Sequence, residues 1–166
     1  MNVVCRRIRL AGSAAVALGA FLLALVPVTA AQAAGPEQFR GTTPISFTDT
    51  TTCGFPITVN VQDSFVGRAF FDAQGNLQSI NLEQNIVGTE SANGITLPES
   101  DHYVEFINVS TGSAKQVGLS VHIQGGGVVI QDAGYLVFNP DGTVTVIAGP
   151  HPFFEGDTAA LCAALS

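Results

Sequence analysis

Apolar and polar residues alternate along most of this chain, and this period of two constrains the fold more than any other feature. Ile57, Val59 and Val61 alternate with polar neighbours, which is typical of strands that bury one face and expose the other. Turn signals such as Asn93-Gly94 separate the alternating runs at short intervals. The pattern predicts an all-β, antiparallel fold in which neighbouring strands form hairpins.

We expect eight or nine strands, at residues 45–51, 56–62, 65–72, 77–88, 101–109, 115–124, 127–132, 134–138 and 143–148. Within the 115–124 run, one buried face is expected to carry Val117, Leu119, Val121 and Ile123. Because nearly every connection is short, the preferred architecture is a single antiparallel β-barrel. A β-sandwich with longer crossovers is the alternative.

The first 33 residues have the features of a secretory signal peptide. A basic start that includes Arg6 and Arg9 leads into an apolar run at 10–28, and Ala31 and Ala33 precede the expected cut. The alternative, a retained membrane anchor, needs about 20 predominantly apolar residues. We therefore expect a signal peptide at 1–33, a flexible tail at 34–43 and one β-barrel domain at 44–166. The protein is expected to be secreted, without membrane insertion after cleavage.

Two cysteines, Cys53 and Cys162, remain after the expected cleavage. In an exported chain such a pair predicts a disulfide. It would close a loop of about 110 residues, which stabilises a fold by roughly 4–5 kcal/mol in the chain-entropy account. A short helix is expected at 158–165, capped by Asp157 and docked through Leu161, Leu165 and the disulfide.

The charge of the exported part excludes some partners. After residue 33 the chain has three basic residues and thirteen carboxylates, a formal net charge of −10. Such a field repels nucleic acid and anionic lipid surfaces. We therefore expect no nucleic-acid partner for this acidic protein.

Motifs for catalysis and metal binding are not found. His102, His122 and His151 are not spaced as metal ligands. The stretch around Ser120 lacks the final glycine of a G-x-S-x-G elbow and lies inside an alternating strand. The sequence assigns no catalytic residue, metal site or cofactor.

Glu99, Asp101 and Glu105 crowd one region of the sequence. Paired carboxylates can carry acid–base chemistry or hold calcium. The preferred interpretation is a solvated acidic edge, which discourages edge-to-edge pairing of sheets.

Four segments carry a resemblance to known proteins. They are Cys53-Gly54-Phe55-Pro56-Ile57, Asp132-Ala133-Gly134-Tyr135, Asp141-Gly142 and Leu161-Cys162-Ala163-Ala164-Leu165. Together they resemble a group of small exported actinobacterial proteins, mostly uncharacterised. The resemblance implies a disulfide-closed β domain and no particular activity. In outline, the expected fold is also similar to small barrels of the lipocalin, dirigent and allene oxide cyclase kind.

These features favour an exported, non-enzymatic β domain that binds a small apolar ligand or a cell-envelope partner. The alternation of side chains along the strands predicts that four residues line the interior and bind the ligand: Phe70, His102, Phe106 and Tyr135. A second hypothesis is a cyclase- or isomerase-like enzyme that acts on a lipid-like substrate in a barrel cavity. A third is a surface or adhesion module with a filled core.

Overall fold

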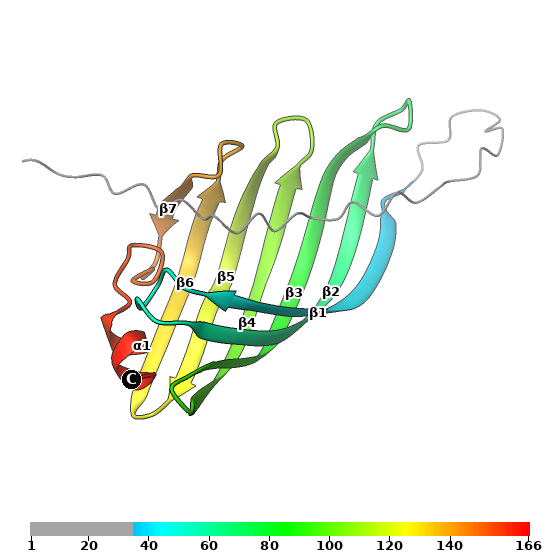
Figure 1. The fold of residues 1–166 in the computed structure, drawn as a ribbon. Coiled ribbons are helices and arrows are strands. Elements are labelled where there is room, and N and C mark those ends of the chain that lie inside the picture. Colours follow the sequence, from blue (N-terminus) through cyan, green and yellow to red (C-terminus); the bar gives the residue numbers. More distant parts are fainter. Residues whose placement is uncertain (1–34) are drawn as a thin grey trace, which may run out of the picture. The chain divides into compact units, whose positions relative to one another are not determined.

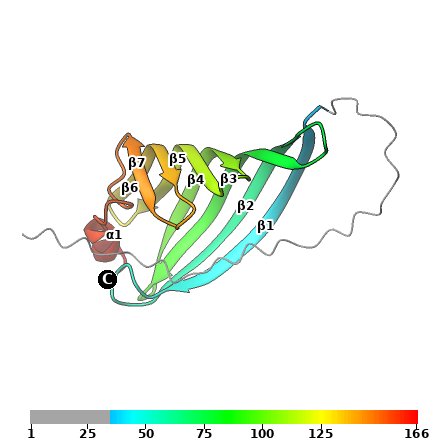
Figure 2. The ribbon, with the colours of Figure 1, turned by 90° about the horizontal axis from the view of Figure 1, so that it is seen from above.

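The computed structural model describes residues 35–166, so the predicted signal peptide lies outside the described residues. The elements are β1 (Glu37–Asp49), β2 (Ile57–Phe71), β3 (Leu77–Ala92), β4 (Ile95–Asn108), β5 (Ser113–Gly125), β6 (Val128–Phe138), β7 (Val144–Ala148) and α1 (Ala159–Ala164). The seven strands form one antiparallel sheet in chain order, and the sheet is strongly twisted and curved (Figures 1 and 2). The predicted all-β class and the hairpin order are confirmed.

The strand count differs from the prediction, because two pairs of expected strands are continuous. The strands expected at 56–62 and 65–72 correspond to the single strand β2, which runs through Asp63 and Ser64 without a break. Those expected at 127–132 and 134–138 correspond to β6, which runs through Gly134. Asp63, Ser64 and Gly134 all keep their pairing with the neighbouring strands, so neither strand is interrupted.

The first strand begins at Glu37, so residues 37–43 lie in β1 rather than in the expected tail. All of β1 except Gly41 and Asp49 is exposed. Residues 37–43 therefore show little of the apolar–polar alternation that predicts a half-buried strand. Within residues 35–166, β1 pairs only with β2 and β7 only with β6. These two strands are therefore the edges of an open sheet.

The turn between β3 and β4 follows directly from its two residues. Asn93 and Gly94 have φ values of 52° and 82°, and they alone separate the two strands. A two-residue turn with both φ values positive matches the twist of a hairpin, and Asn-Gly is its preferred sequence. The predicted hairpin is confirmed.

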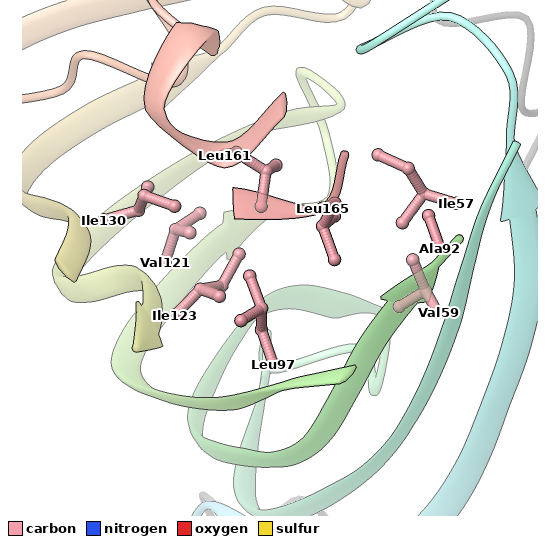
Figure 3. Close-up of a cluster of buried hydrophobic side chains, with 9 residues drawn as sticks. All are labelled: Ile57, Val59, Ala92, Leu97, Val121, Ile123, Ile130, Leu161 and Leu165. Atoms are coloured by element: carbon pink, nitrogen blue, oxygen red, sulfur yellow. The ribbon is translucent and has the colours of Figure 1, made fainter. Parts of the chain in front are cut away.

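The hydrophobic core lies between one end of the sheet and α1. Leu161 of α1 and Leu165, the residue that follows the helix, are 1% and 0% exposed, and they point toward side chains of the strands (Figure 3). Those side chains are Ile57, Val59, Ala92, Leu97, Val121, Ile123 and Ile130. Burial of one such side chain contributes about 1.5–3 kcal/mol. The predicted docking of the helix through its two leucines is confirmed.

A disulfide fixes the C-terminal segment to the β1–β2 connection. Cys53 and Cys162 are bonded, with their Cα atoms 5.2 Å apart, which confirms the predicted pair. At the other end of α1, the side-chain amide of Asn93 donates a hydrogen bond to the Leu165 carbonyl at 2.8 Å. The predicted cap is wrong: Thr158, not Asp157, precedes the helix, and its side chain makes no capping hydrogen bond. In the described part of the chain, no helix is long and apolar enough to cross a membrane.

Candidate functional site

The two faces of the sheet are distinguished by the residues that cover the core. We call the face that carries Ile57, Leu97 and Ile123 the inner face, and the opposite one the outer face. Residues that are Cα partners in neighbouring strands share a face. Val59 pairs with Glu90, which pairs with Leu97, so Glu90 also lies on the inner face.

A β-bulge in β5 changes which side chains face inward. Glu99 pairs with Ile123 and His102 with Leu119, so β5 has one more residue than β4 between these pairs. Its pairing with β6 also shifts between Leu119 and Val121, which leaves Ser120 as the extra residue. An extra residue reverses the alternation of the strand. The expected single face for this run is therefore wrong: Val117 and Leu119 lie on the outer face, whereas Val121 and Ile123 lie on the inner face.

Five carboxylates cross the inner face in adjacent strands. We call them the acidic belt: Asp63, Glu90, Glu99, Asp101 and Glu105. Asp101 is 4% exposed and Glu90 is 8% exposed. One oxygen each of Asp63, Glu90 and Glu99 is buried without a hydrogen-bond partner among the described residues. Buried carboxylates without partners are costly, so this belt needs a physical explanation.

At the centre of the belt, Glu99 and Asp101 are hydrogen-bonded to each other through their side chains. Burial raises the pKa of both carboxyls, and the charge of Glu99 contributes to raising the pKa of Asp101 to about 8. The backbone N–H of His122, next to the bulge, donates to Asp101 Oδ1 at 2.7 Å. A hydrogen bond between two carboxyls needs one proton, and the raised pKa values favour its retention.

Glu90 stands beside this pair. Burial raises its pKa to about 7, and the nearby charges of Glu99 and Asp49 act in the same direction. Glu90 therefore changes its charge close to neutral pH.

A chain of polar side chains continues the belt along β3 and β4. The Tyr103 hydroxyl donates to Gln84 Oε1 at 3.2 Å, and Gln84 Nε2 donates to Glu105 Oε2 at 3.0 Å. Burial raises the pKa of Tyr103 and of Glu105. These groups orient one another.

The predicted solvated acidic edge is wrong. Glu99, Asp101 and Glu105 lie on β4, which is a central strand between β3 and β5. A signal for this placement was present in the sequence, because Glu99 and Asp101 have the parity of Leu97, which is 1% exposed. Starting the predicted strand at residue 101 left Leu97 out of the pattern.

The four residues nominated as interior lining lie on the outer face. Phe70 pairs with Ser79, and His102 pairs with Leu119. Phe106 and Tyr135 have the same outward register, and Phe106 is 41% exposed. Val104 and Phe106 are apolar, so their side of the strand is predicted to be buried, and His102 lies on that side. In the structure the buried side of β4 carries acids instead. Because the four residues are spread over β2, β4 and β6, the sheet does not bring them to one place.

An apolar wall accompanies the acidic belt on the inner face of β1. Phe39, Ile45 and Phe47 are 37%, 37% and 52% exposed. Phe39 packs edge-to-face on Phe65, with ring centroids 6.2 Å apart. It also lies over Gly67, where a Cβ atom would approach the Phe39 ring to 2.2 Å. The inner face therefore offers partly exposed aromatic and aliphatic surface two strands away from the carboxylates of β3.

A separate open groove of about 320 Å³ lies along β1–β3 and is lined mostly by outer-face residues, including Arg40, Val66 and Glu83. The buried, unpartnered carboxylates are not among its lining residues. Among residues 35–166, no three His, Cys, Asp or Glu side chains are arranged to hold a metal ion.

Asp132 and His151 form a second buried polar group with a structural role. Asp132 is 0% exposed and accepts the backbone N–H groups of Phe153 and Phe154, both at 3.0 Å. His151 is 1% exposed, and its Nε2 contacts the Ala148 carbonyl at 3.2 Å. These contacts fix the loop that follows β7.

In comparisons with known proteins, no family model, curated protein or solved structure matched this chain.

Proposed function

We propose that this chain is an exported, non-enzymatic binding domain whose inner face takes a small ligand with a largely apolar body. The observation that carries the proposal is the composition of the inner face. Partly exposed Phe39, Ile45 and Phe47 lie on β1. The acidic belt of buried and half-buried carboxylates lies on β2–β4, and three of its members have a buried oxygen without a hydrogen-bond partner among the described residues. A domain that needed only stability would fill these positions with packed apolar side chains.

The open sheet supports this proposal. Helix α1 lies at one end of the sheet (Figure 1), while Ile80, Leu82 and Ile107, on the inner face farther along, are only half-buried. In this proposal the curved sheet acts as the wall of a partial barrel, and the apolar body of the ligand lies against β1, in which every residue except Gly41 and Asp49 is exposed.

The test is native mass spectrometry on protein purified from its own culture medium. We expect a reproducible extra mass that is lost on denaturation, and its identity would name the ligand. A clean mass of the protein alone, together with no binding of an apolar fluorescent dye, would contradict the proposal.

A second candidate is a cyclase- or isomerase-like enzyme, which the Glu99–Asp101 pair favours. Two hydrogen-bonded carboxyls whose pKa values are raised by burial can supply a paired acid and base. The ligand found by mass spectrometry separates the two candidates. If the ligand is converted by the wild-type protein, and Asp101→Asn still binds it without conversion, the domain is an enzyme.

A further inference from the structure

Charge is sorted between the two faces of the sheet. All three basic residues of the described chain, Arg40, Arg68 and Lys115, have outer-face register. Of the nine carboxylates in strands, only Glu83 lies on the outer face. The other eight lie on the inner face: Glu37, Asp49, Asp63, Glu90, Glu99, Asp101, Glu105 and Asp132. The inner face therefore has no positive charge of its own.

The burial of these acids makes the missing counter-charge significant. Glu90 is more than nine-tenths buried, and its Oε2 has no hydrogen-bond partner among the described residues. Glu90 pairs with Leu97, and Glu99 and Asp101 are the next two inner-face positions of the same strand as Leu97, so the three carboxyls are neighbours on the inner face. Ser120, the bulged residue of the adjacent strand, is 6% exposed and its hydroxyl is also unpartnered. A buried ion is favourable only when it is paired and hydrogen-bonded.

The kind of cation follows from the surroundings. The acids are not arranged as a metal-ligand set within residues 35–166, so a bare metal ion is not the best match. The apolar wall of Phe39, Ile45 and Phe47 on the same face favours an organic cation with an apolar body. An ammonium group supplies several hydrogen-bond donors and the positive charge that would balance the carboxylates.

We infer that the inner face binds an organic ammonium ion, with Glu90, Glu99 and Asp101 as its counter-ions and the apolar part of the ligand against β1. This inference rests on the proposed function, since it specifies the class of the ligand. Binding would replace the proton shared by Glu99 and Asp101 with the positive charge of the ligand. The proton would be released to solvent.

Three probes with the same alkyl chain test the inference: decylamine, decanol and decanoate. Each is titrated calorimetrically into the purified protein at pH 7.5, below the concentration at which it aggregates. We expect decylamine to bind at least about tenfold more tightly than decanol, because a charge-assisted hydrogen bond contributes about 1.5–3 kcal/mol. Decanoate should bind most weakly, since it brings a like charge.

The outcomes separate the two proposals. If none of the three probes binds, the proposed function and the inference both fail. If decanol binds as tightly as decylamine, or decanoate binds best, the apolar binding face stands and the inference is overturned. A release of protons on decylamine binding, seen as a dependence of the heat on the buffer, would support the replacement of the shared proton.

Two variants locate the site. Asp101→Asn keeps an oxygen for the His122 N–H, and Glu90→Gln keeps the side-chain shape. Each should weaken decylamine binding about tenfold and leave decanol binding unchanged. Glu83→Gln, which removes an exposed carboxylate from the outer face, is the matched control and should bind all three probes as the wild type does. Circular dichroism of each variant checks the fold. If the two inner-face variants bind decylamine normally, the named counter-ions are wrong.

Discussion

At the scale of single residues, Glu90 and Asp101 are acids that the fold places away from water, and no basic side chain of residues 35–166 lies on their face of the sheet. Burial is the first cause of their raised pKa values, about 7 for Glu90 and about 8 for Asp101, and the neighbouring Glu99 adds to it. The ordinary values are 4.5 and 3.8, so folding binds protons at these sites between about pH 4 and pH 8. Stability is therefore coupled to pH in a direction opposite to that of a salt-bridged carboxylate.

We predict that the free energy of unfolding falls as the pH rises from 5 to 8. The contribution of Glu90 and Asp101 is fully present below their ordinary pKa values, and it is lost as the pH passes through about 7 and about 8. After allowance for solvent screening we expect a loss of about 1–2 kcal/mol. The measurement is urea unfolding at half-unit steps of pH.

Three variants control this pH measurement. Glu90→Gln and Asp101→Asn should each flatten the profile and raise stability at pH 8, whereas the outer-face Glu83→Gln should leave the slope as it is. Hydrogen bonds lower the pKa of Asp72 and Asp141, so these two groups titrate below the measured window. A stability that is constant or rises between pH 5 and pH 8 would contradict the burial of the belt.

At the scale of elements, α1 and the disulfide act together. The helix has only six residues, too few to be stable alone in water. It is held by Leu161 and Leu165 in the core and by the bond from Cys162 to Cys53. The sequence separation across the bond is 109 residues, so the bond restricts most of the unfolded chain.

We predict that Cys53→Ser combined with Cys162→Ser lowers the free energy of unfolding by about 4–5 kcal/mol, as the chain-entropy account gives for a loop of this length. Thermal and urea unfolding of the double variant would measure the loss. Ala163→Ser, at an exposed position of the same helix, is the control and should change stability by less than about 0.5 kcal/mol. Equal stability of the double variant and the wild type, or free thiols in the wild type, would contradict the role assigned to the bond.

The elements also show what the sequence can predict about this fold. Asn93-Gly94 specifies its hairpin locally, and the pairing of Cys53 with Cys162 follows from their number. The bulge at Ser120 has no local signal, since the residues around it continue the alternation. Likewise, the alternation after residue 101 gives β4 two faces without showing which one is buried; only Leu97, which precedes the predicted strand and alternates in step with Glu99 and Asp101, indicates the inner face. Apolar residues normally decide that choice, and here the acids of Glu99 and Asp101 occupy the inner face.

At the scale of the whole domain, the chain carries a large uncompensated charge. Thirteen carboxylates and three basic residues follow residue 33, and eight of the acids share one face of a single sheet. Self-repulsion of this kind destabilises the compact state. It is strongest where the acids are ionised, and salt screens it over about 10 Å at 0.1 M and about 3 Å at 1 M.

We predict that sodium chloride stabilises the folded domain at pH 8. Between about 0.01 M and 0.5 M salt, the thermal midpoint should rise by a few degrees, since about 1 kcal/mol shifts the midpoint of a domain of this size by roughly 2–8 °C. The same titration at pH 4 is the control: many carboxylates are then neutral, so the rise should shrink. Decylamine at low salt and pH 8 should also raise the midpoint, and added salt should reduce its effect because both act on the same charges. A midpoint that falls with salt at pH 8 would mean that attractive pairs, rather than repulsion among the acids, dominate the electrostatics of the domain.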